Sequence, residues 1–128
     1  MENVGLSEAA KRSGVTALNS PNGWLSIPSM FSDTPRNTII QWGTVSMPIS
    51  TAGGIGGWVQ STTTFPFPIS FPNACFATSC SLLHGGSSTQ WVAIAQIAPH
   101  TNTIGRALMQ SFYPLETAPL ITWMAIGY

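Results

Sequence analysis

The sequence has very few charged side chains. Only eight of its 128 residues are Asp, Glu, Lys or Arg, where average usage would give roughly 32. The formal net charge is zero, so the chain lacks a long-range field that would attract phosphate backbones or anionic lipids. This excludes a nucleic-acid-binding protein. A hydrophobic content of 44 % with so little net charge also excludes an intrinsically disordered chain.

Long apolar runs and cysteines are scarce as well. Pro or Gly interrupts every apolar stretch before the ~18 residues of a transmembrane helix, so no membrane insertion is predicted. The N-terminus has Glu2 and Glu8 where a signal peptide would have a basic region and an apolar run. Cys75 and Cys80 are five residues apart on one predicted strand, which would place them on opposite faces. We therefore expect free, buried thiols, and the spacing offers no zinc site.

The few charges are unevenly distributed along the chain. Six of the eight lie in the first 36 residues, and only Arg106 and Glu116 lie in the remaining 92. A surface made of uncharged polar and apolar groups would be poorly soluble on a lone monomer, so we expect copies of the chain to cover one another. The change in composition divides the chain into a lead-in segment, residues 1–36, and a domain, residues 37–128. The lead-in is expected to be extended, with a short helical stretch at residues 7–12.

The domain has the pattern of an all-β protein. Short β-branched and aromatic runs alternate with clusters of Gly, Pro, Asn and Ser, which is typical of an antiparallel β-sandwich. The runs predict strands at residues 38–47, 58–67, 74–83, 90–97, 103–112 and 120–127. The proline-rich stretch 65–72 is expected at a rigid corner, because proline cannot occupy a central ladder position. Residues 90–97 are apolar on both faces, which indicates a second layer from another chain.

Three sequence blocks resemble the C-terminal domain of bacteriophage tail fibres. They are Ile39-Ile40-Gln41-Trp42-Gly43-Thr44-Val45, Phe67-Pro68-Ile69-Ser70-Phe71-Pro72-Asn73-Ala74-Cys75 and Thr122-Trp123-Met124-Ala125-Ile126-Gly127-Tyr128. That family has IIQWG, FPIAFPNAC and a terminal WIAIGY in the same order, so the resemblance covers residues 37–128. Residues 2–12 look like the short linking repeat of fibre shafts, which makes residues 1–36 an expected shaft segment.

The resemblance implies a function in host attachment. It implies an intertwined homotrimer of β-sandwich-like subunits at the distal end of a virion's tail fibre, made and assembled in the bacterial cytoplasm, in some fibres with an assembly chaperone. The implied partner is a bacterial surface receptor, with lipopolysaccharide or another surface glycan as the expected class. A purely structural trimerisation cap, with receptor contact elsewhere, is the main alternative. The Gly-rich stretch before Trp58 and residues 112–120 depart from the family pattern, so the resemblance does not identify the receptor.

The alternation of strands predicts which connections meet at the distal end. If successive strands are antiparallel, residues 48–57, 84–89 and 113–119 gather at one end, opposite the shaft. Exposed aromatic rings suit the apolar faces of sugars, and small polar side chains supply hydrogen bonds. The receptor-binding candidates in or beside these connections are Trp58, His84, Ser87, Ser88, Gln90, Tyr113 and Glu116.

The remaining candidate residues favour structural roles. Trp42, Trp91 and Trp123 stand in apolar strand context and are expected in the core or in a subunit interface. A polysaccharide depolymerase would need two carboxylates ~5–9.5 Å apart, whereas the domain contains Glu116 alone, so an enzyme is not predicted. One histidine per chain could form a metal site on a trimer axis, but no spacing selects one. We predict no metal and no cofactor.

Overall fold

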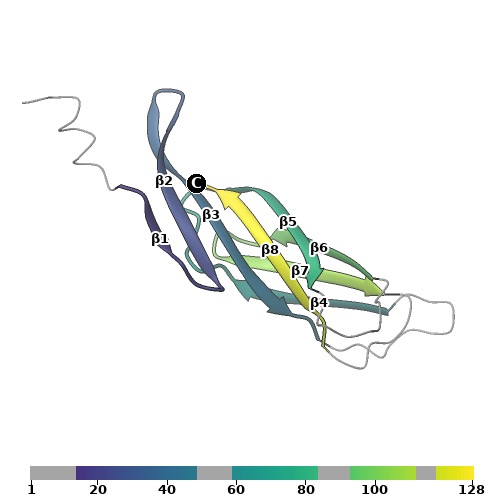
Figure 1. Cartoon of the computed structure of the whole chain (residues 1–128). Coiled ribbons are helices and arrows are strands. Elements are labelled where there is room, and N and C mark those ends of the chain that lie inside the picture. Colours follow the sequence, from purple (N-terminus) through teal and green to yellow (C-terminus); the bar gives the residue numbers. More distant parts are fainter. Residues whose placement is uncertain (1–13, 49–58, 84–92, 112–117) are drawn as a thin grey trace, which may run out of the picture.

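The computed structural model of the chain is all-β and describes residues 14–48, 59–83, 93–111 and 118–128. The strands in these ranges are β1 (Thr16–Leu18), β2 (Gly23–Phe31), β3 (Thr34–Ser46), β4 (Val59–Pro66), β5 (Cys75–Leu83), β6 (Ala93–Pro99), β7 (Ile104–Ser111) and β8 (Leu120–Gly127). They form two antiparallel sheets, ordered β1-β2-β3-β8-β5 and β4-β7-β6, which pack on each other (Figure 1). The predicted all-β, antiparallel fold is confirmed. No helix in the described ranges has the length and apolar character of a transmembrane span.

The strands match the six predicted runs to within a few residues. Strands β1 and β2, by contrast, belong to a segment that the sequence pattern assigns to an extended lead-in. Pro28 interrupts the apolar pattern of β2, yet β2 tolerates it because β1 pairs with β2 only up to Ser26. Among the described residues, β2 has a strand neighbour at Pro28 only on the β3 side, and proline is tolerated at such an edge. The predicted helical stretch 7–12 lies outside the described residues.

The core lies between the two sheets and is mainly aromatic. Trp123 from β8 packs against Phe65 and Phe67, with ring centroids 4.9 and 5.6 Å apart, and Phe67 meets Phe71 at 5.1 Å. Aliphatic side chains and alanines from both sheets fill the remaining space: Ile39, Val45, Met47, Ala107, Met109, Ile121 and Ala125. The predicted proline-rich corner is confirmed, since the chain turns between the sheets after Pro66 and resumes strand structure at Cys75.

A buried glutamine joins that corner to the five-stranded sheet. Gln41 is fully buried on β3. Its Nε2 donates to the carbonyl of Ile69 at 2.8 Å, and its Oε1 accepts from the Ile69 N–H at 2.9 Å. The side-chain amide therefore replaces the missing strand neighbour of Ile69 and satisfies both of its backbone groups.

The two cysteines are free, as predicted, but they are half-buried rather than buried, and they do not lie on opposite faces. A β-bulge at Phe76 lets Cys75 pair with Gly127 and Cys80 with Trp123, and both side chains pack toward the core. The bulge adds one residue to β5 and so reverses the parity that simple alternation would give. Burial raises the pKa of both thiols above the ordinary value.

Candidate functional site

The strand ends that flank three connections of the chain lie at one end of the sandwich. Leu120, at the start of β8, pairs with Ser46 at the end of β3 and with Leu83 at the end of β5. In the other sheet, Ser111 at the end of β7 pairs with the first residues of β4 and β6. The strand ends that flank residues 48–57, 84–89 and 113–119 therefore lie together, as the alternation of strands predicts. We call this the loop end (Figure 1).

The receptor-binding candidates belong to those connections. Trp58, His84, Ser87, Ser88, Gln90, Tyr113 and Glu116 all lie outside the described residues, and so does Trp91. Their role in binding stays a prediction.

The opposite end is closed by backbone and aromatic contacts. The backbone N–H of Tyr128 donates to the carbonyl of Ala74. The backbone carbonyl oxygen of Tyr128 accepts from the N–H groups of Asn73 and Ala74 at 2.8 and 3.0 Å. The Tyr128 ring lies 4.8 Å from the Phe31 ring and 5.3 Å from the guanidinium carbon of Arg36. We call this the Tyr128 end; it includes the turn from β6 to β7, where Asn102 accepts from the Phe71 N–H.

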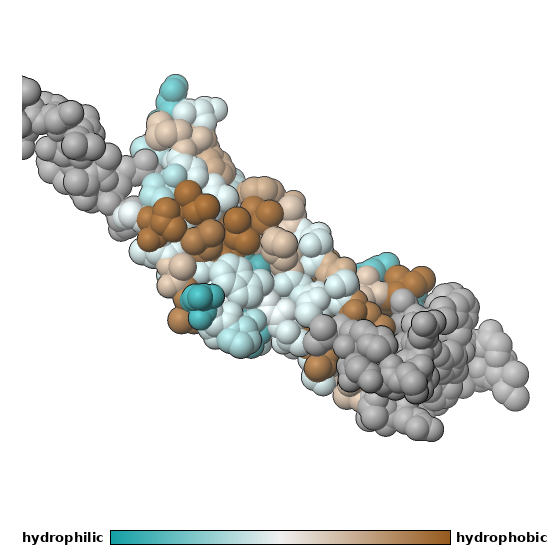
Figure 2. Space-filling view, in the orientation of Figure 1, coloured by the Kyte–Doolittle hydropathy of each residue, from teal (hydrophilic) through white to brown (hydrophobic). Residues whose placement is uncertain are grey.

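The outer face of the five-stranded sheet carries exposed apolar side chains. Phe76, Met124 and Leu120 are 59, 43 and 36 % exposed. Leu120 and Met124 lie on the side away from the core, because Ile121 and Trp123 of β8 are buried and their neighbours in sequence are not. Phe76, at the bulge of β5, has its ring 6.2 Å from the Tyr128 ring. Figure 2 shows hydrophobic residues gathered on this sheet near the C-terminal end of β8. Such a face is typical of an interaction surface.

Two of the predicted structural tryptophans differ in burial. Trp123 is 4 % exposed in the core. Trp42, by contrast, is only half-buried on the outer face, where its Nε1–H donates to the carbonyl of Ser20 at 2.8 Å. A ring held in this way beside exposed apolar neighbours suits an interface better than the core of a single chain.

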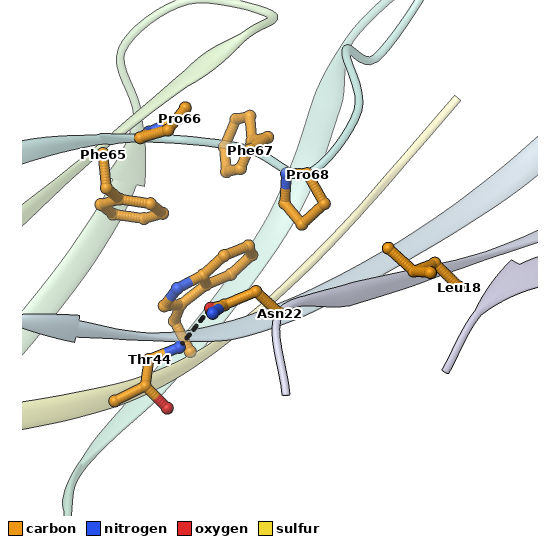
Figure 3. Close-up of a pocket in the computed structure, with 8 residues that line it drawn as sticks. Leu18, Asn22, Thr44, Phe65, Pro66, Phe67 and Pro68 are labelled. Carbon is orange, nitrogen blue, oxygen red and sulfur yellow. Dashed lines mark hydrogen bonds between the residues drawn. The ribbon is translucent and has the colours of Figure 1, made fainter. Parts of the chain in front are cut away.

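A groove lies on the side of the sandwich where β4 is the edge strand. It has a volume of about 580 Å³ and is lined by Leu18, Asn22, Thr44, Phe65, Pro66, Phe67, Pro68 and Trp123 (Figure 3). The other side is closed, because the Thr78 hydroxyl on β5 donates to the carbonyl of Ile97 on β6 at 3.0 Å. Nothing in the sequence signals this groove, since its walls come from segments as distant in sequence as Leu18 and Trp123.

The described part of the chain holds no cluster of three His, Cys, Asp or Glu side chains that could bind a metal ion. His100 is exposed in the turn from β6 to β7, with its Nε2 at 3.5 Å from a guanidinium nitrogen of Arg106.

Comparison with known proteins places the chain among tail fibre proteins. Residues 33–128 match the family described as "Putative tail fiber protein gp53-like, C-terminal". The whole chain is 32 % identical over 130 residues to the "Uncharacterized protein StfP" of Escherichia coli K12, and it spans about half of that relative, 56 % of its length.

Solved fibres have the same fold. An N-truncated R1-type pyocin tail fibre superposes with a TM-score of 0.70 at 24 % identity, covering 100 % of this chain and 98 % of the other. The P. aeruginosa R1 pyocin fibre comprising C-terminal residues 323–701 gives a TM-score of 0.68 at 25 % identity, covering 95 % of this chain and 30 % of the other. On the family match over residues 33–128, this protein belongs to the gp53-like tail fibre family and contains its C-terminal domain.

Proposed function

We propose that this domain attaches a phage particle to a receptor on the bacterial surface, and that the loop end makes the contact. The observation that carries the proposal is the register that brings the ends of β3, β5 and β7 together at one end of the sandwich. Loops gathered at one end of a rigid β-scaffold are the usual position of recognition residues. The sequence adds the aromatic candidates Trp58 and Tyr113 and several small polar ones in or beside these connections.

The proposed receptor is a saccharide, with lipopolysaccharide or another surface glycan as the class. Trp58 and Tyr113 would stack on apolar sugar faces, while Ser87, Ser88, Gln90, His84 and Glu116 would form hydrogen bonds. With so few charges, binding should change little with salt concentration. Each contact would be weak, but three copies on one fibre tip raise the avidity by ~10²–10⁴-fold.

The proposed assembly is a homotrimer at the distal end of the fibre. The outer face of the five-stranded sheet supports it, because a wet antiparallel sheet face should carry polar residues whereas this one presents Leu120 and Met124. Residues 1–36 would connect the domain to the shaft. Assembly would take place in the host cytoplasm, with an assembly chaperone as a further proposed partner.

A trimerisation cap is the second candidate function. The exposed apolar face favours it independently of the loop end, and one domain could serve both purposes. Family membership and the fibre fold favour a structural protein over an enzyme.

Cell binding tests the proposal. The purified chain, labelled with a fluorophore, is incubated with intact cells of several strains, before and after chemical removal of surface polysaccharide. We expect binding to a subset of strains and its loss on stripping. Strain-selective binding that survives stripping would point to a protein receptor, whereas no binding to any strain, together with a stable trimer, would favour the cap. Released glycan fragments would contradict a non-enzymatic function.

A further inference from the structure

The groove beside β4 combines an apolar floor with an open, apolar rim. Phe65, Phe67 and Trp123 are 8, 6 and 4 % exposed and form the floor. Leu18, which is 48 % exposed, and the exposed ring of Pro66 stand at the rim. The described residues of the lining include no Asp, Glu, Lys, Arg or His, which favours a neutral ligand.

Two N–H donors meet in this groove without an acceptor. No described residue accepts a hydrogen bond from Trp123 Nε1. Among the described residues, Ser61 Oγ is the one fully buried side-chain atom that lacks a hydrogen-bond partner, so Trp123 Nε1 is not fully buried. The indole N–H therefore keeps some exposed surface, and Trp123 lines both this groove and a second hollow beside Trp42 and Met124. A tryptophan this buried normally has a hydrogen-bond partner, so the open donor indicates a site for an acceptor atom from outside the chain.

Asn22 supplies the second donor. Its Oδ1 accepts from the Thr44 N–H at 3.0 Å, which fixes the amide (Figure 3) and leaves Nδ2 without a partner among the described residues. A Cβ on Gly43 would lie 2.4 Å from Asn22 Oδ1 and 2.9 Å from Trp123 Nε1. Because Gly43 has no side chain, the Asn22 amide and the Trp123 indole can both pack against the backbone of β3 at Gly43.

The chemistry of the groove selects an acetamido group. Two N–H donors need a carbonyl oxygen as acceptor, and the adjacent phenyl and proline rings need a small apolar group such as a methyl. We propose that the groove is a subsite for an N-acetylated, uncharged sugar, with its acetyl oxygen on Trp123 Nε1 and Asn22 Nδ2 and its methyl against Phe65 and Pro66. A groove of about 580 Å³ lies within the ~300–1,000 Å³ of ligand pockets. The inference rests on the proposed saccharide receptor and adds a second contact, on the flank of the domain.

The test uses N-acetylglucosamine and glucose as probes, measured by saturation-transfer NMR on the full chain. We expect a signal on the acetyl methyl protons, with a dissociation constant in the millimolar range, and no comparable signal from glucose. Trp123→Phe removes the N–H donor but keeps an aromatic ring, and should weaken binding by about tenfold, as for the loss of one buried hydrogen bond. Its matched control is Trp42→Phe, whose N–H donates to Ser20 and not into the groove.

Asn22→Asp provides a second, independent variant. It keeps an oxygen for the Thr44 N–H but replaces the Nδ2 donor with an acceptor, so sugar binding should fall while thermal unfolding stays unchanged. Equal signals from the two sugars, or unaltered binding in both Trp123→Phe and Asn22→Asp, would overturn the inference. The inference would also be overturned if the wild type bound no sugar and Pro66→Asp lowered the mass of the particle. The groove would then be a contact between subunits.

Cell binding separates this inference from the proposed function. If Trp123→Phe and Asn22→Asp bind cells as the wild type does and neither alters sugar binding, the groove is not a subsite but attachment by the loop end stands. If the wild type binds N-acetylglucosamine in the groove but no cells, the attachment function fails and the subsite stands.

Discussion

The two faces of the five-stranded sheet both carry apolar side chains, but only the inner face packs on another described sheet. Along β8, Ile121, Trp123 and Ala125 are at most 4 % exposed on the inner face, whereas Leu120 and Met124 are 36 and 43 % exposed on the outer one. The inner face packs on β4 and β7, whereas no described strand packs over the outer face. Apolar side chains thus occur on both faces of this sheet, whereas the described residues of one chain bury only the inner face.

The difference indicates what the outer face is for. On β3, β5 and β8 its described residues include one charged side chain, Arg36, which lies over the Tyr128 ring at the Tyr128 end. A sheet face exposed to water usually carries polar side chains, while the apolar ones point to the core. We infer that a second copy covers the outer face in the proposed trimer.

The largest expected effect comes from the inner face. Trp123→Ala removes a buried ring that contacts Phe65 and Phe67, and should lower the free energy of unfolding by ~3–5 kcal/mol. Trp42→Ala should cost less in the isolated chain because its ring is half-buried, and Trp58→Ala should not alter stability. Equal shifts of thermal unfolding for all three variants would contradict this division.

The buried amide of Gln41 should have the next largest effect. Gln41→Leu leaves the N–H and the carbonyl of Ile69 unpaired in the interior, which should cost about 2–4 kcal/mol. The matched control is Gln60→Leu, because Gln60 bonds to Gln110 on an exposed surface. Denaturant unfolding measures both, and a similar loss in the two variants would show that burial of the Gln41 bonds is unimportant.

On the outer face we expect a change in assembly rather than in chain stability. Met124→Lys introduces a charge into the proposed interface and should lower the mass measured by light scattering from three times 13.6 kDa toward that of one chain. Ile94→Lys, at a 49 % exposed position on the three-stranded sheet, serves as the comparison. A wild-type mass of one chain at micromolar concentration would refute the trimer.

The smallest effect concerns the thiols, which the bulge places on the inner face. Because burial raises the pKa of Cys75 and Cys80 and the thiolate is the reactive form, iodoacetamide should label the folded chain more slowly than the denatured chain at neutral pH. The folded rate should rise with pH as the thiolate fraction grows. Equal rates in the folded and denatured chains would contradict this burial.

Much of the fold could be predicted from the sequence, and the reasons for the misses are physical. Period-two patterns and turn residues located the strands from β3 to β8, but Pro28 concealed β2, since only the register reveals that this position is an edge. The bulge at Phe76 could not be inferred from alternation. Gln41 and the groove depend on contacts between distant segments, such as Asn22 with Thr44, which carry no local signal.

Cell attachment by variants at the two ends tests the central claim most directly. The double variant Trp58→Ala/Tyr113→Ala alters the loop end, and His100→Ala alters an exposed residue in the turn from β6 to β7 at the Tyr128 end. With folding and mass shown to be unchanged, we predict that the double variant loses binding to susceptible cells by ~10²-fold or more, as expected when a multivalent contact is removed, and that His100→Ala binds normally. Undiminished binding by the double variant, with loss in His100→Ala, would show that the receptor meets the opposite end.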